Sequence, residues 1–384
     1  MNAPRCGPPV GRRRFLAGLG AAGAVGLAGC ANPFAGPEQD AGEVTLGDFR
    51  GSGPLVESRG EYEGTRIDDL PALSGPLTIY LGGGEGGVYG DLLDLFRRIY
   101  PDFDPRVNDA PSAQLANTLI EESRGGSTQP DVFWSIDAGS LGIVADEGLF
   151  SALPGNVVES VPRTYHPDDQ WVGVAGRARS VPYNTDAMSA DDVPESVMAF
   201  PETGAFRDAI GWAPSYGAFQ SFVTAMRLVE GEAATREWLE AMMDLGAQSY
   251  NNEFFVSNAV ADGALRAGFA NHYYALRVRA SRPEAPLDLA FTSGDAGALV
   301  NVAGVGVLAD SGRGDLAANF AHHLLTVEAQ EFFATRSFAY PTVADIPPVG
   351  GLPTIDELDP PDLDLSELSD LQPTLDLMRE VGLL

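Results

Sequence analysis

The chain has 384 residues and a formal charge of −30, so it is long enough for two domains and too acidic for a nucleic-acid binder, which needs basic patches. Because 44% of its residues are hydrophobic, it is also not a disordered acidic chain. All 24 basic residues are arginine. A lysine-free acidic surface is typical of a halophile, where molar salt shortens the Debye length to about 3 Å and screens self-repulsion.

The N-terminus has the pattern of an export signal, which we assign to residues 1–29. Arg12 and Arg13 form a twin-arginine pair before an apolar stretch that is too short for a bilayer-spanning helix of about 20 residues. The stretch ends at Leu27-Ala28-Gly29-Cys30, which resembles a lipoprotein cleavage box of the haloarchaeal type, so Cys30 is the predicted site of lipidation. Apart from Cys6 in the signal, no other cysteine exists for a disulfide or a zinc site.

Residues 30–75 lack periodicity and are rich in Gly, Pro, Asp and Glu, which predicts a disordered tether. The folded body is expected to start with a strand at 77–81, a glycine loop at 82–87 and a helix at 88–99. The loop matches G-x-G-x-x-G, but an exported protein meets no cytosolic dinucleotide pool. These glycines also allow a ligand to approach backbone N–H groups.

The following segments alternate between strand and helix, which predicts a parallel sheet. A buried strand is expected at 130–135, with Asp137 just beyond its end and a short helix at 141–147. The long extended stretch 171–185 is expected to cross between two lobes. It carries Arg177 and Arg179 on one face, because side chains alternate along a strand.

Later segments complete the second lobe and return to the first. A turn at 213–219 opens a helix at 220–230, and residues 249–253 are expected to form a polar loop. A short strand at 264–270 leads to Asn271-His272-Tyr273-Tyr274. The first predicted lobe comprises residues 76–178 and 292–384, and the second comprises residues 179–291. Strand patterns at 286–291 and 300–308 return the chain to the first lobe, and helices then close it.

The adjacent tyrosines admit two interpretations. Phenolates are hard anionic oxygen donors that suit a trivalent cation such as ferric iron. Alternatively, Tyr273 and Tyr274 are aromatic residues at the edge of a core, with hydroxyls that bind water.

Seven segments together resemble one family, the iron(III)-type substrate-binding proteins of ABC importers, in the periplasmic binding protein superfamily. The matching segments are 77–80, 130–141, 176–179, 183–185, 211–214, 271–274 and 359–365. The resemblance implies an α/β, two-lobed fold of class II, with the ligand in a hinge cleft that closes on binding. It also implies an ABC permease as partner.

The resemblance assigns ferric iron to Tyr273 and Tyr274 and a synergistic anion to the turn Tyr216-Gly217-Ala218 and to Asn271. It places an arginine of the segment that contains Arg177 and Arg179 beside the site. Two phenolates leave a ferric ion with net positive charge, so an anion held by a helix N-terminus and an arginine would complete the site. Because phenol ionises near pH 10, iron affinity should depend on pH.

The chain departs from the family pattern at two positions. Gly84 stands where some members have histidine, and Ile136 where some have glutamate or glutamine. The neighbouring Glu85 and Asp137 are the alternative oxygen donors, and Tyr183 is a candidate third phenolate.

The same fold could bind an organic or oxyanionic solute without metal, with Arg177 or Arg179 pairing the anion. An enzyme is disfavoured because no G-x-S-x-G, H-E-x-x-H or cysteine nucleophile occurs after the signal. We therefore expect an exported, lipid-anchored, monomeric binding protein on the outer face of the cell membrane.

Overall fold

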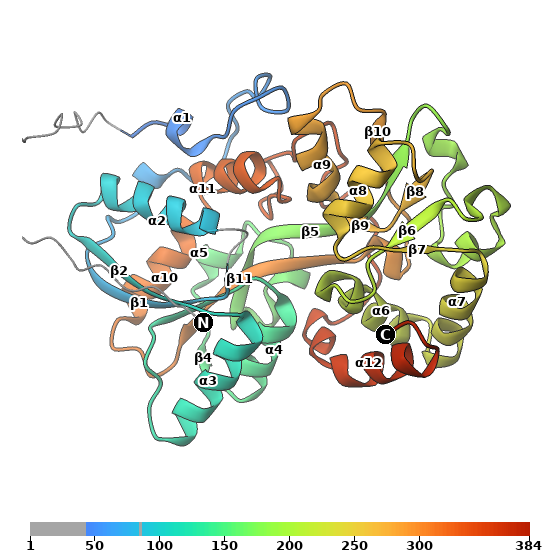
Figure 1. Ribbon diagram of the computed structural model, residues 1–384. Helices are drawn as coiled ribbons and strands as arrows, with labels where there is room; N and C mark the ends of the chain where they lie inside the picture. Colours follow the sequence, from blue (N-terminus) through green and yellow to red (C-terminus); the bar gives the residue numbers. More distant parts are fainter. Residues whose placement is uncertain (1–43, 84–86) are drawn as a thin grey trace, which may run out of the picture. The chain divides into compact units, whose positions relative to one another are not determined.

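The computed structural model describes residues 44–83 and 87–384, which belong to one compact unit, Glu43–Leu384 (Figure 1). The predicted signal, Cys30, the first part of the tether and Glu85 lie outside the described residues. Among the helices of the described residues, none is both long and apolar enough to cross a bilayer.

Within the described residues, 11 strands form a continuous sheet with the path order β2-β1-β3-β11-β5-β8-β6-β7, to which β4, β9 and β10 attach. The strands are β1 (Gly75–Leu81), β2 (Phe103–Asp109), β3 (Val132–Ser135), β4 (Phe150–Ser151), β5 (Trp171–Asn184), β6 (Ile210–Trp212), β7 (Gln248–Ser249), β8 (Ala267–Gly268), β9 (Ala270–Asn271), β10 (Leu287–Ala290) and β11 (Val300–Leu308). The mixed α/β class predicted from the sequence is confirmed.

Helices alternate with these strands along the chain. The α-helices are α1 (Leu46–Phe49), α2 (Val88–Ile99), α3 (Ser112–Arg124), α4 (Ala138–Asp146), α5 (Gly155–Val158), α6 (Gly217–Val229), α7 (Glu232–Asp244), α8 (Glu253–Ala261), α9 (His272–Ser281), α10 (Gly314–His323), α11 (Val327–Phe332) and α12 (Leu371–Glu380). Strand β1 pairs in parallel with both β2 and β3, as the strand–helix alternation predicts.

Strand β2 was not anticipated from the sequence. It stands at the end of the sheet order, and most of its side chains are exposed. It also contains Pro105 between the charged residues Asp104 and Arg106. Proline and charged residues are tolerated on an edge strand, where one row of backbone groups needs no partner in the sheet, so the apolar pattern of a buried strand is missing.

Strand β5 joins the two halves of the sheet. Its first part, from Trp171 to Ala178, pairs with β11, whereas its last part, from Val181 to Asn184, pairs with β10. Between them, Arg179 and Ser180 pair with β9. The long extended stretch therefore crosses between the halves as predicted.

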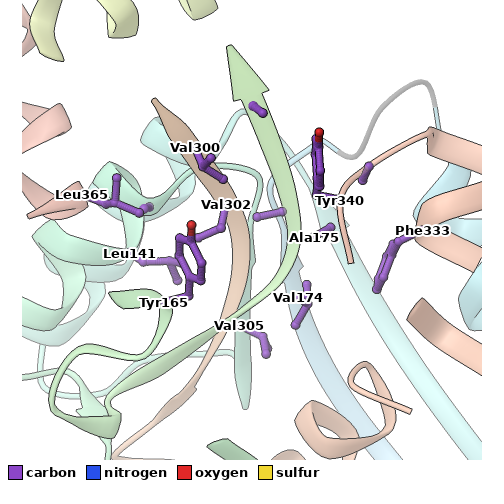
Figure 2. Close-up of a cluster of buried hydrophobic side chains, with 14 of the residues drawn as sticks. Leu141, Tyr165, Val174, Ala175, Val300, Val302, Val305, Phe333, Tyr340 and Leu365 are labelled. Atoms are coloured by element: carbon purple, nitrogen blue, oxygen red, sulfur yellow. The ribbon is translucent and has the colours of Figure 1, made fainter. Parts of the chain in front are cut away.

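The side chains around β5 and β11 pack on both faces of the crossing strands. Figure 2 shows Tyr165 and Leu141 to one side of these strands and Tyr340 and Phe333 to the other. Two glycines of β5 allow this close packing. A Cβ on Gly173 would lie 3.1 Å from Tyr165 Cβ, and one on Gly176 would lie 3.0 Å from Tyr340 Cβ.

The described residues from 44 onward correct the tether prediction, which extended to residue 75. Phe49 is 1% exposed, with its ring 6.3 Å from that of Phe96. Arg59 is nearly buried and forms an ion pair with the fully buried Glu331 of α11. Single apolar residues and an ion pair dock this segment, and such widely spaced contacts create no periodic pattern in the sequence.

The C-terminal segment packs on two helices that are far apart in the chain, α4 and α6. Its short 3-10 helix, η10 (Leu365–Ser369), packs on α4, where a Cβ on Gly142 would lie only 2.7 Å from Ser366 Cα. The following α12 packs on α6, where the Thr374 and Thr224 hydroxyls are 2.9 Å apart. The glycine in α4 is thus what allows the chain end to approach closely.

Candidate functional site

A cavity of about 400 Å³ lies where the crossing strand β5 meets the N-termini of α4, α6 and α9. Its walls include eight of the residues that the sequence singled out. They are Asp137, Arg177, Arg179, Tyr216, Gly217, Ala218, Asn271 and Tyr273. Residues separated by more than a hundred positions in the chain therefore share one pocket.

Tyr273 and Tyr274 lie in the first turn of α9, which begins at His272 directly after strand β9. Their rings are 4.4 Å apart, and the Arg277 guanidinium lies 5.0 Å from the Tyr273 ring centre. Tyr273 lines the cavity, whereas the Tyr274 hydroxyl forms a hydrogen bond with the hydroxyl of Tyr216. The pair thus presents one phenol to the cavity and a second one to the turn before α6.

Burial, followed by the neighbouring Tyr273, raises the pKa of Tyr274 above that of a free phenol. In the metal-free protein at neutral pH, this hydroxyl therefore carries its proton. A cation that binds the oxygen must displace that proton.

His272 has a structural role beside the pair. Its ring is fully buried, its Nε2 donates to the Phe338 carbonyl at 2.7 Å, and its Nδ1 lies 3.2 Å from the Ala178 N–H, which donates to it. Burial lowers the pKa of this imidazole to about 4, so it is neutral at physiological pH. His272 connects the start of α9 to strand β5 and is absent from the cavity lining.

The predicted anion turn lies at the N-terminus of α6. Helix α6 starts at Gly217, and among the described residues no side chain caps its Tyr216 end. Gly217 and Ala218 line the cavity, and a Cβ on Gly217 would meet no atom within 4 Å. The first N–H groups of a helix carry partial positive charge, so this end suits an anion.

Arg179 belongs to a buried polar network that the sequence did not reveal. The guanidinium forms an ion pair with Glu253, and its Nη1 also donates to Asn271 Oδ1 at 3.2 Å. Glu253 was expected in a polar loop but is the first residue of α8. The available signal was Asn252, an N-cap residue before the apolar positions of α8, whose side chain accepts from Phe255 N.

Three candidate metal ligands have other surroundings. Asp137 lines the cavity, but it caps α4, with one oxygen accepting from Ser140 N at 2.7 Å and the other from Ser140 Oγ at 3.1 Å. Tyr183 lies four residues beyond Arg179 along β5, about 13 Å away, and is absent from the lining. Glu85 lies outside the described residues.

Several lining residues were missed, because they come together only in the fold. They include Ser140, Ser221 and Asn301, together with Leu368, Ser369 and Leu371 of the C-terminal segment. Across the described residues, no cluster of three or more His, Cys, Asp or Glu side chains could hold a metal.

The crossing strand and the cavity beside it define a binding protein of the periplasmic type. A family model described as bacterial extracellular solute-binding protein matches residues 127–352. The "Iron uptake protein A2" of Synechocystis sp. is 32% identical over 284 residues, which cover 70% of this chain and 81% of that protein. The "Major ferric iron-binding protein" of Neisseria meningitidis is 29% identical, covering 72% of this chain and 85% of that protein.

The solved structure of iron-bound HitA from Pseudomonas aeruginosa has a TM-score of 0.69 and 26% identity, and the match covers 80% of this chain and 99% of that one. The predicted two-lobed fold is thereby confirmed. The chain belongs to the bacterial extracellular solute-binding protein family, whose members are transport proteins and not enzymes.

Proposed function

We propose that this chain captures ferric iron, with an accompanying anion, in the cavity beside β5 and delivers it to the permease of an ABC importer. The observation that carries the proposal is the arrangement of Tyr273, Arg179 and the N-terminus of α6 around one cavity. Tyr273 and its neighbour Tyr274 supply phenol oxygens for the ion, and the other two groups supply donors for the anion. The names of the relatives, which refer to iron, support the same cargo.

The charge of the donors explains why ferric iron needs the anion-binding groups as well as the two phenols. Ferric iron bound by two phenolates keeps one net positive charge, which an anion would neutralise in a partly buried site. Solute-binding proteins of this family work with ABC permease subunits. The remaining metal donors are proposed to come from Asp137 or Glu85 after lobe closure, because Tyr183 lies too far along β5.

The test uses protein purified without metal. Ferric nitrilotriacetate should produce a visible phenolate-to-iron absorption band and should raise the thermal unfolding temperature, because a ligand that binds only the folded state stabilises it. Gallium nitrilotriacetate is the control for trivalent charge, since it should stabilise the protein without producing colour. A protein that neither absorbs nor is stabilised would contradict the proposal.

An organic or oxyanionic solute without metal is the second candidate. It is favoured by the hydrogen bond between Tyr216 and Tyr274, which ties up one phenol of the pair. It is also favoured by the capping of α4 with both oxygens of Asp137. In a thermal-shift panel of phosphorylated and carboxylated solutes, this candidate predicts stabilisation without iron, whereas the first predicts a response to ferric iron.

We also propose that Cys30 is lipidated after twin-arginine export and tethers a monomeric protein to the outer face of the membrane of a halophile. The support is the sequence alone: Arg12-Arg13, the apolar stretch and the 54 acidic residues against 24 arginines. Cys30→Ser is expected to move the protein from the membrane fraction to the medium, as measured by immunoblotting of both fractions. Retention in the membrane would contradict lipidation at this residue.

A further inference from the structure

Residues 44–70, which we call the N-terminal strap, precede strand β1 and lie outside the region 127–352 that the family model matches. Figure 1 shows this segment in blue, passing over α11 toward α9. The Gly51 N–H donates to Thr335 Oγ1 at 2.8 Å, and a Cβ on Gly51 would collide with the Thr335 carbonyl oxygen. Thr335 and Phe333 belong to the turn that continues α11, and the Phe333 ring lies 6.3 Å from that of Trp134 in β3. The strap is therefore seated on the half of the fold that contains β1 to β3.

Arg59 of the strap has partners on two separate segments. Its side chain is 5% exposed, and its Nε donates to both carboxylate oxygens of the fully buried Glu331 in α11, at 2.9 and 3.1 Å. Its Nη2 donates to the Pro347 carbonyl at 2.9 Å, and its Nη1 donates to the Pro348 carbonyl at 3.3 Å. One guanidinium therefore joins α11 to the loop that contains these two prolines.

That loop continues into the other half of the fold. Val349, directly after Pro348, is 2% exposed and belongs to the apolar cluster of α8, α9 and β10. Leu55 of the strap is half-buried against the same cluster. A Cβ on Gly350 would lie 2.9 Å from Leu276 Cδ2 of α9 and 4.0 Å from Leu55 Cδ2. The strap, the loop and α9 therefore meet at one place.

We propose that the N-terminal strap ties the two lobes together and limits how far they separate, with Arg59 and Leu55 as its positioning residues. When the lobes rotate apart about the crossing strand β5, α11 moves relative to the cluster of α8 and α9, so the strap loses contacts with one of them. The arrangement that the strap favours is the one in which Asp137 before α4 and Tyr273 of α9 line the same cavity. A solute that needs both walls then meets a larger fraction of binding-competent protein, whether or not it is ferric iron.

The distance between the lobes in the metal-free full-length chain tests the proposal. The chain has two cysteines, Cys6 and Cys30, so replacing both with serine leaves a background for specific labelling. Nitroxide labels on Gln114→Cys in α3 and Glu237→Cys in α7, two exposed positions, then report this distance by double electron–electron resonance. With the strap unaltered, the labels should give one narrow distance distribution.

Two variants of the labelled protein weaken the strap at different points. Arg59→Gln leaves Glu331 paired with Arg50 but removes the charge that joins α11 to the loop. The fraction of molecules outside the narrow distribution should rise at least about fivefold, because charge-assisted hydrogen bonds that hold one state of a two-state equilibrium are lost. Leu55→Ala removes apolar contact with the cluster of α8 and α9 and should raise the same fraction at least about threefold.

Arg66→Gln is the matched control. Arg66 lies in the same strap and forms an ion pair with Glu328 of α11 at 3.4 Å, on one side of the crossing. Its loss weakens the docking of the strap on α11 but leaves Arg59 and Leu55 in place, so the distance distribution should equal that of the unaltered strap.

An unchanged distribution in both Arg59→Gln and Leu55→Ala would overturn the proposal. Equal broadening in Arg66→Gln and Arg59→Gln would also overturn it, because docking on α11 alone would then explain the effect. Should Arg59→Gln not fold, Leu55→Ala decides by itself, since it alters no charge. These distances are measured without metal, so a chain that takes up no iron would contradict the proposed function and leave the role of the strap standing.

Discussion

Replacing both Tyr273 and Tyr274 with phenylalanine is expected to abolish the visible band and to weaken ferric binding by more than about a thousandfold, or roughly 4 kcal/mol. The change removes two hydroxyl oxygens and keeps the aromatic rings that pack 4.4 Å apart at the start of α9. Because the described residues contain no cluster of three or more His, Cys, Asp or Glu side chains to replace them, little affinity should remain. Competition against nitrilotriacetate, followed by the absorbance of the bound iron, measures the loss.

Tyr340→Phe is the matched control for this pair. Tyr340 is fully buried, is absent from the cavity lining, and its hydroxyl meets no partner among the described residues. Removing that hydroxyl should leave iron affinity unchanged and should not lower the free energy of unfolding, because an unsatisfied buried polar group is costly. Normal iron binding by the double variant of Tyr273 and Tyr274 would exclude the phenols as ligands.

Iron affinity is expected to fall steeply as the pH decreases from 8 to 5. Burial and the neighbouring Tyr273 raise the pKa of Tyr274, so its hydroxyl is protonated in the metal-free protein throughout this range. Each phenol that binds the ion releases one proton, so the bound state holds fewer protons and is favoured by rising pH. Affinity should therefore drop about tenfold per pH unit for each phenol, and about a hundredfold for two.

Nitrilotriacetate competition at each pH, corrected for protonation of the chelator, gives the number of protons released. Tyr274→Phe should lower that number by one if it still binds iron. An affinity that is independent of pH, or a proton count that is equal in the variant and the wild type, would show that Tyr274 does not ionise on binding.

Much of the fold follows from local patterns in the chain. The apolar run of β1 and the stripe of α2 are visible because one face or both faces of each element are buried. The length of β5 similarly indicated a crossing segment. Edge strand β2 and the docked segment around Phe49 left no such pattern, since few of their residues enter the core.

The sequence by itself determined which residue types are available for a site: adjacent tyrosines, a helix-opening turn at Tyr216 and two arginines on one face of a crossing strand. These are properties of residue type and short-range spacing, which the chain order fixes. The sequence did not determine which of the candidate residues lie in the same cavity. Tyr183, although on the same strand as Arg179, is absent from the cavity lining because each residue advances a strand by about 3.3 Å.

Only the tertiary structure decided how the site is supported. Glu253 and Arg179 are 74 positions apart, and their ion pair forms because α8 and β5 pack together in the second half of the sheet. Leu368 and Ser369 reach the cavity because glycines in α4 allow the chain end to approach. Such contacts depend on packing between distant segments. In a long acidic chain, the sequence does not distinguish a carboxylate that becomes buried and paired from one that stays exposed.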